Sequence, residues 1–291
     1  LAKITPSVKN LKLDGRLNGS LNINQLKSVY LPKSSLTVDN LKVNDLNLGS
    51  FKAAIHGNQS LTNYDVNISL KEDANESLSV MGTLDVSGDN SNLDLDISFN
   101  DFILDPLNPF GADVITNIRG EISGFTSLSG QLEKPQIEGR LVLDNAGLAI
   151  PYLNVGYDFA EATIISLKNQ SFIFDKALMS DVDFQSQAYL SGNISHNNFS
   201  NWSLDLNIDS DRLLVLNTIE QDESLYYGTA FVAGDIDVSG PTDQLFVEAN
   251  VGTSDGTIFK IPLNDSEILS ESSYISFLSP DQKTTKITAQ D

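Results

Sequence analysis

Apolar and polar residues alternate along most of the chain with a period of two. The segment LDLDISF (93–99) places leucine, isoleucine and phenylalanine at every second position, with aspartate or serine between them. The segments VNISL (66–70) and LDLNID (204–209) repeat this pattern, and weaker copies recur along the chain. Strict alternation is typical of a β-strand with one buried and one solvent-facing side. The sequence therefore predicts an all-β protein.

Short segments rich in glycine, asparagine and aspartate separate the alternating runs. They are LDGRLNGS (13–20), VSGDNSN (86–92), LDNAG (143–147), LSGNIS (190–195) and TSDGT (253–257). These residue types tolerate the positive φ angles of hairpin turns. The regular spacing favours an elongated antiparallel meander. Helical periodicity is confined to short segments, of which DPLNPFGADV (105–114) is expected to begin with Asp105 as the cap.

One phrase occurs twice, as LVLDNAGLAIP (141–151) and as VEANVGTSDGTIFKIP (247–262). Each copy joins two apolar runs through a segment that contains glycine, and we expect a turn at Asn145–Gly147 in the first copy. No stretch has the composition of a linker. We therefore predict one continuous segment over residues 1–291, with repeated modules at about 80–152 and 190–263.

The alternation leaves two ways to bury the apolar faces. A compact sandwich would pack them against a second sheet. A single sheet curled along its length would instead gather them inside an open trough. Periodicity alone is compatible with both arrangements.

Composition narrows the classes of partner. The chain has 18 basic and 39 acidic residues, a net charge of −21, which disfavours nucleic acid and anionic membrane surfaces. Hydrophobic residues make up 40% of the chain, so it is not an acidic disordered tail. The absence of cysteine excludes disulfides, zinc–thiolate sites and thiol catalysis.

Catalytic motifs are not found in the sequence. It has no nucleophile elbow, no phosphate-binding loop and only two histidines, His56 and His196, both in polar segments where we expect exposed turns. Asp94 and Asp96 share a strand face, but the same spacing recurs elsewhere and suits a solvated surface. Two binding roles remain as alternatives to a purely structural role for the polar residues. They are weak calcium binding at 87–92 or 209–212 and sugar stacking at 225–228. We expect no enzyme activity, no cofactor and no resident metal.

Longer segments carry a family resemblance. The segment SLSGQLEKPQIEGRLVLDNAGLAIP (127–151) resembles a recurring phrase of the TamB proteins, members of the AsmA-like group. The segments at 101–110 and 225–263 are also similar to that family, the second to its Bacteroidetes-type members. The resemblance covers roughly residues 80–280. The positions that fall on the phrase are Gly130, Leu132, Pro135, Gly139, Leu141 and Leu143.

The resemblance implies a fold and a location. TamB-like proteins have a β-rich, taco-shaped groove with an apolar interior. They lie in the periplasm of Gram-negative bacteria, anchored in the inner membrane, and have no known catalytic residue. This chain is therefore expected to be a segment of such a periplasmic body, with an open apolar groove and few short helices.

The resemblance also implies a function, which is the transfer of phospholipid or other acyl-chain lipid between the two membranes. One alternative is assembly of outer-membrane proteins with an Omp85-family barrel partner. A second alternative is an extracellular β-solenoid adhesin or sugar-binding protein. The residues expected to line the lipid groove are Val66, Ile68, Leu70, Leu93, Leu95, Ile97, Phe99, Leu141, Leu143, Leu204, Leu206, Ile208, Val247 and Val251.

Overall fold

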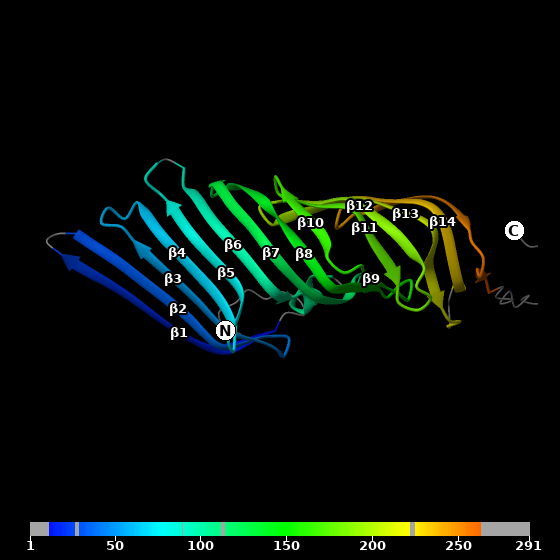
Figure 1. The fold of residues 1–291 in the computed structure, drawn as a ribbon, viewed down its shortest axis with the longest axis horizontal. Coiled ribbons are helices and arrows are strands. Elements are labelled where there is room, and N and C mark those ends of the chain that lie inside the picture. Colours follow the sequence, from blue (N-terminus) through cyan, green and yellow to red (C-terminus); the bar gives the residue numbers. More distant parts are fainter. Residues whose placement is uncertain (1–11, 27–28, 89, 112–113, 222–224, 263–291) are drawn as a thin grey trace, which may run out of the picture.

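A single antiparallel sheet of sixteen strands makes up almost all of the structure, which confirms the predicted all-β meander (Figure 1). This computed structural model describes residues 12–262 except 27–28, 89, 112–113 and 222–224. The strands are β1 (Leu13–Leu26), β2 (Val29–Val43), β3 (Leu46–Gly57), β4 (Asn63–Glu72), β5 (Asn75–Asp85), β6 (Asn92–Ile103), β7 (Thr116–Gln131), β8 (Lys134–Ile150), β9 (Val155–Phe159), β10 (Thr163–Lys168), β11 (Ser171–Asp181), β12 (Gln187–Asn197), β13 (Ser200–Thr218), β14 (Tyr227–Pro241), β15 (Phe246–Thr253) and β16 (Ile258–Lys260).

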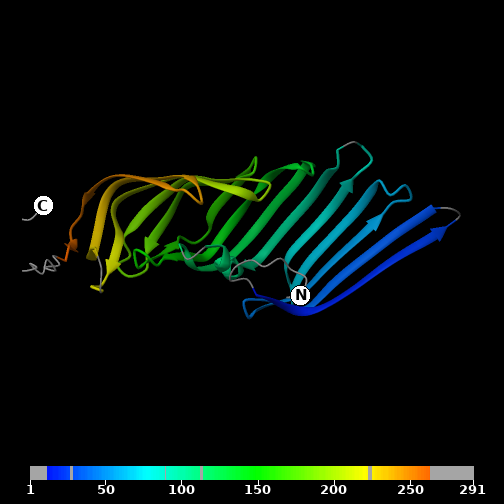
Figure 2. The same ribbon diagram turned by 180° about the vertical axis from the view of Figure 1, so that it is seen from behind.

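The strands pair in sequence order and stack along the long axis of the molecule (Figures 1 and 2). At two places in the strand order, two short strands lie end to end and together occupy the place of one long strand. β9 and β10 both pair with β8 and β11, and β15 and β16 both pair with β14. The sheet therefore has fourteen strand positions. A 3₁₀ helix at Asp105–Gly111 interrupts the meander between β6 and β7, at the place where the sequence predicts a short helix.

The expected turn at Asn145–Gly147 is wrong. β8 continues through this segment, and the pairing with β7 instead shows a register shift there, between Glu121↔Asp144 and Arg119↔Gly147. Asn145 has a φ of 48°. Asparagine and glycine supply positive φ for a bulge as readily as for a turn, so composition alone does not separate the two. The second copy differs from the first, because its glycine-containing segment, residues 254–257, does interrupt the chain between β15 and β16.

Glycines on the apolar side of the sheet bring neighbouring strands close together. Gly124 and Gly192 have φ angles of 146° and 112°. A Cβ atom on Gly124 would lie 2.3 Å from the carbonyl oxygen of Arg140, and one on Gly192 would lie 2.1 Å from that of Asp205. Such close approaches are typical of points where a sheet bends. These positions therefore favour curvature of the sheet.

The buried residues gather in two clusters on one side of the sheet. The smaller cluster, near the first strands, consists of Val43, Leu48 and Leu70, with residues such as Phe51 and Phe102 packed against it. The larger cluster belongs to the second half of the chain. Its members are Leu104, Ile137, Leu141, Leu143, Ala146, Val155, Tyr157, Ile165, Leu167, Phe174, Ala177, Met179, Ala188, Leu190, Leu213, Leu214 and Phe231.

Candidate functional site: a continuous apolar face

A row of apolar residues crosses the whole sheet, with one residue from each strand position. Directly paired residues of neighbouring antiparallel strands lie on the same face, so the register defines this row. We call it the first apolar row. It consists of Leu17, Val38, Phe51, Leu70, Leu78, Phe99, Gly124, Leu141, Ile165, Phe174, Gly192, Leu206, Val238 and Val247.

A second apolar row runs beside the first, two residues away along each strand. It contains one polar residue, Thr126, whose hydroxyl donates a hydrogen bond to the carbonyl oxygen of Glu138 at 2.9 Å. That bond satisfies the hydroxyl within the sheet. The row consists of Gly19, Leu36, Ala53, Ile68, Val80, Ile97, Thr126, Gly139, Leu167, Phe172, Ile194, Leu204 and Gly240.

All fourteen residues predicted to line the groove share this face. Five belong to the first row, three to the second, and the other six lie on the same strands at even offsets from a member of the first row. Their exposure differs: Leu70 and Leu141 are buried, whereas Val247 on the edge strand β15 is 66% exposed. The register thus places these side chains together, and their contact with lipid stays a prediction.

Several members of the rows were missing from the prediction. Phe51, Leu78, Ile165 and Phe174 lie in strands whose alternation is broken by glycine, alanine or consecutive apolar residues. The glycines of the first row were missed as well, although EISGFTSLSG (121–130) places Gly124 where alternation calls for an apolar residue. A glycine at an apolar position of a strand is the signal that could have identified them.

The opposite face of the sheet carries mostly polar side chains. Asp94, Asp96 and Ser98 alternate with the lining residues of β6 and are all exposed. Asp205 and Asp237 hold corresponding positions on β13 and β14 and are also exposed. Their repetition agrees with a solvated surface. Among the described residues, no group of three or more His, Cys, Asp or Glu is arranged to hold a metal ion.

The apolar face closes on itself between β9 and β13. The Tyr157 hydroxyl on β9 donates a hydrogen bond to the carbonyl oxygen of Leu214 on β13 at 2.7 Å, although two strands separate them in the sheet order. The backbone of Asn217 likewise donates to the carbonyl oxygen of Leu153 at 2.9 Å. Leu213, Leu214 and Phe231 are almost completely buried beside this contact. The sheet therefore forms an enclosed lobe here.

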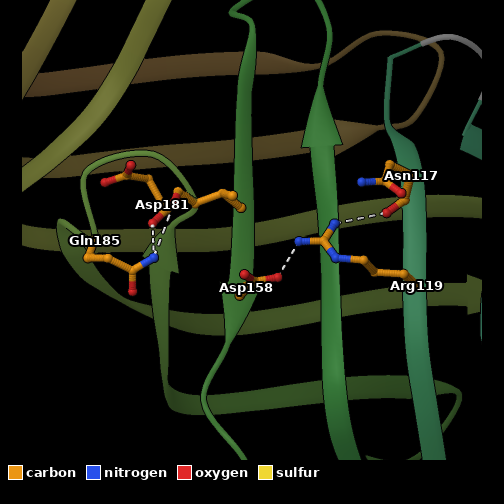
Figure 3. A network of polar contacts seen from close by, with 6 residues as sticks. Asn117, Arg119, Asp158, Asp181 and Gln185 are labelled. Carbon is orange, nitrogen blue, oxygen red and sulfur yellow. Dashed lines mark hydrogen bonds and ion pairs between the residues drawn. The ribbon is translucent and has the colours of Figure 1, made fainter.

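A buried carboxylate supports this lobe. Asp181 is fully buried and accepts hydrogen bonds from the backbone of Phe184 and Ser186, both at 2.6 Å, and from the Ser186 hydroxyl. The backbone of Leu214 donates in turn to Ser186 Oγ at 2.8 Å. Burial, and then the charge of Asp181, raise the pKa of Tyr157, so its hydroxyl stays protonated and donates. Figure 3 shows Gln185 bonded back to Asp181 within the same turn.

An ion pair crosses β8 near the lobe. Arg119 on β7 and Asp158 on β9 form an ion pair (Figure 3). Gly147 on β8 lies between them, in register with both residues. A Cβ atom on Gly147 would lie 2.5 Å from the Arg119 guanidinium, so only glycine leaves room for the pair. Arg119 also donates to the carbonyl oxygen of Asn117 at 3.1 Å. These contacts connect three strands on the rim of the sheet.

The expectation for His196 is wrong, since this side chain is buried. Its ring stacks on Phe199 with centroids 4.6 Å apart and lies near Trp202. Its Nδ1 accepts a hydrogen bond from the backbone of Phe199 at 3.1 Å, while Nε2 is buried without a partner. Burial lowers the pKa of His196. The polar flanking sequence gives no sign of this aromatic cluster, which forms when β12 pairs with β13. His56 is exposed as expected, but it lies within strand β3 and not in a turn.

Comparison with known proteins adds one match. Residues 179–291 match the family model of the TamB C-terminal domain. No curated protein and no solved structure matches the chain. Within the part of the chain that the structure describes, no helix is long and apolar enough to cross a membrane.

Proposed function

We propose that this chain, which carries a TamB C-terminal domain and so belongs to the TamB family, holds the acyl chains of lipids against its apolar face. TamB proteins belong to the envelope of Gram-negative bacteria and are non-enzymatic modules linked to lipid transfer or to outer-membrane protein assembly. More specifically, we propose that this chain is a segment of a periplasmic bridge for lipid transfer, within a protein anchored in the inner membrane.

The first apolar row is the observation that carries this proposal. Neighbouring strands lie about 4.8 Å apart, so fourteen positions span roughly 60 Å. An acyl chain gains about 0.8 kcal/mol for each methylene removed from water. Because no polar residue interrupts the first apolar row, an acyl chain can move along it from strand to strand while the lipid headgroup stays in water. The acidic outer face keeps the structure soluble and disfavours adsorption to anionic headgroups.

Charged substitutions on the apolar face test this function. Leu95→Asp and Leu206→Asp place a carboxylate on the lipid path, and we expect lipid that co-purifies with the chain to fall about tenfold or more, because an unpaired charge is costly in apolar surroundings. Ser98→Asp and Ser166→Asp add the same charge to the outer face as matched controls. Lipid mass spectrometry and circular dichroism measure the outcome. Equal lipid retention in both pairs of folded variants would reject the proposal.

The exposed edge of the sheet favours a second candidate, which is assembly of outer-membrane proteins through strand addition. Every residue of β15 and β16 is exposed, and within the described residues no strand pairs with their outer edge. An exposed edge can add a strand from a client or from an Omp85-family barrel. Capture of such a barrel that is lost on removing residues from 242 onward, yet survives Leu95→Asp, would support this role.

A further inference from the structure

A cavity opens on the rim of the sheet where the turn between β4 and β5 meets the end of β6. Its volume is about 430 Å³. The apolar part of its lining is formed by Leu48, Leu70, Phe102 and Ile103. Leu48 and Leu70 are buried members of the smaller cluster, and the other two pack against that cluster. The cavity therefore has an apolar floor that the fold itself holds in place.

The floor joins the cavity to the lipid path. Leu70 lines the cavity and is also a member of the first apolar row. Phe102 contacts Phe99, another member of that row, with ring centroids 5.7 Å apart in an edge-to-face arrangement. An acyl chain lying along the row could therefore begin at this cavity without crossing a polar barrier.

The rest of the lining holds three neutral residues, Ala74, Asn75 and Ser77, and three acidic ones. Glu72, Asp73 and Asp101 contribute three carboxylates, and among the described residues no lysine or arginine lines this cavity. The nearby Lys71 is paired with Glu76 at 3.4 Å. Asp101 is fixed by Ser123, whose hydroxyl donates to its carboxylate at 2.9 Å. The charge at this entrance therefore opposes an anionic headgroup and favours a cationic one.

We propose that this cavity receives the headgroup of an acyl lipid that carries a primary ammonium, while the acyl chain follows the first apolar row. This inference rests on the proposed function and adds its headgroup selectivity. An ammonium can donate three hydrogen bonds to surrounding carboxylates, and charge-assisted bonds of this kind are strong. A free metal ion would leave the apolar floor unused, and an anionic lipid would meet like charge. A lipid with an ammonium headgroup pairs its charge with the carboxylates and places its apolar part against the floor of the cavity.

The test offers the 291-residue chain vesicles of equal parts dioleoyl phosphatidylethanolamine, phosphatidylcholine and phosphatidylglycerol. Bound lipid is then quantified by mass spectrometry after the vesicles are removed. We expect phosphatidylethanolamine to be enriched about fivefold over phosphatidylglycerol, with phosphatidylcholine between them because its quaternary ammonium donates no hydrogen bond. Equal retention of the three lipids, or enrichment of phosphatidylglycerol, would overturn the headgroup site while leaving the groove intact. Retention of no lipid would overturn the proposed function as well.

Matched variants separate the cavity from the overall charge of the protein. The triple variant Glu72→Gln, Asp73→Asn and Asp101→Asn removes three negative charges from the entrance, and asparagine tolerates the positive φ of Asp73 and Asp101. A control triple variant removes three from the outer face, by changing Asp65, Asp94 and Asp96 to asparagine. We expect the first to lose the preference while total bound lipid is kept, and the second to retain it. Loss of the preference in both variants would contradict a local site.

Discussion

The first strands and the later strands of this sheet carry the same alternating pattern but pack differently. In the N-terminal half, β1–β6, the apolar face has one small buried cluster, and Leu17 and Leu36 of the apolar rows are more than a third exposed. In the C-terminal lobe, β8–β14, the face closes over a larger core in which Leu214 is fully buried. Alternation thus determines which residues face inward, whereas contacts between distant strands determine how far that face closes.

The difference originates in bulges and in hydrogen bonds that skip strands. The pairing of β13 with β14 shifts register twice, between Ser210 and Leu213 and between Leu214 and Leu216. Bulges of this kind bend a strand. Tyr157 and Leu153 then bond directly to β13. The N-terminal half has register shifts, but its strands bond in the meander order. We expect the lobe to be the stable anchor of the groove and the N-terminal half to be its more accessible part.

The largest effect should come from the core of the lobe. Leu214→Ala removes a fully buried side chain and should lower the free energy of unfolding by about 3–4 kcal/mol. Leu17→Ala in the N-terminal half removes a side chain that is 37% exposed and should cost about 1 kcal/mol or less. Urea unfolding followed by circular dichroism measures both. Equal losses would contradict the division into a packed lobe and an open half.

The buried carboxylate should give the next largest effect. Asp181→Ala leaves the backbone donors of Phe184 and Ser186 without their acceptor, and we expect a loss of about 2–3 kcal/mol in unfolding free energy. Asp183→Ala removes an exposed carboxylate from the same turn, which accepts a bond from Asn217, and should cost under about 1 kcal/mol. Similar losses for the two variants would show that the network around Asp181 does not support the lobe.

Glycine substitutions should affect both regions alike. Gly82→Ala in the N-terminal half and Gly192→Ala in the lobe each place a Cβ atom 2.0–2.1 Å from a neighbouring carbonyl oxygen, and both glycines have positive φ. We expect each to lower the unfolding free energy by about 1–3 kcal/mol. Gly252→Ala meets no atom within 4 Å and should stay within about 0.5 kcal/mol of the parent. If Gly82→Ala leaves the unfolding free energy unchanged, close strand approach at glycine is important only in the lobe.

The smallest effect concerns pH. Burial lowers the pKa of His196 below the unfolded value of 6.5, so between these two pKa values the unfolded state binds more protons than the folded state. The contribution of His196 is fully present above about pH 6.5 and decreases as the pH falls toward the folded pKa. His196→Phe should therefore flatten the stability profile between pH 7 and pH 5.5, measured by urea unfolding at each pH. An unchanged profile in His196→Phe would show that the histidine does not titrate with folding.

The sequence predicts the inward and outward positions well where alternation is strict. LDLDISF identifies Leu93 and Leu95 as inward and Asp94 as outward, and the register agrees. The turns are harder to predict, because LDGRLNGS, LDNAG and LSGNIS lie inside β1, β8 and β12, where glycine and asparagine serve bulges and close approaches. Prediction from the sequence therefore divides long strands into shorter ones.

The enclosed lobe and the acidic cavity could not be predicted. Leu213 and Leu214 interrupt the alternation, and only the contact with β9 shows why both are buried. The cavity combines Leu48 on β3 with Asp101 on β6, residues more than fifty positions apart. Such juxtapositions depend on register and curvature, which alternation does not specify.

The central claim is that acyl chains contact the first apolar row at the positions that the core of the protein leaves partly exposed. Photo-crosslinking measures this directly, with benzoylphenylalanine placed in separate variants at Phe51, Phe99 and Leu206 on the row, and at Lys52, Ser98 and Asp205 on the outer face. The account predicts that all three positions on the row capture lipid in cells and that the outer positions do not. Capture at the same low level on both faces, in variants that fold normally, would contradict it.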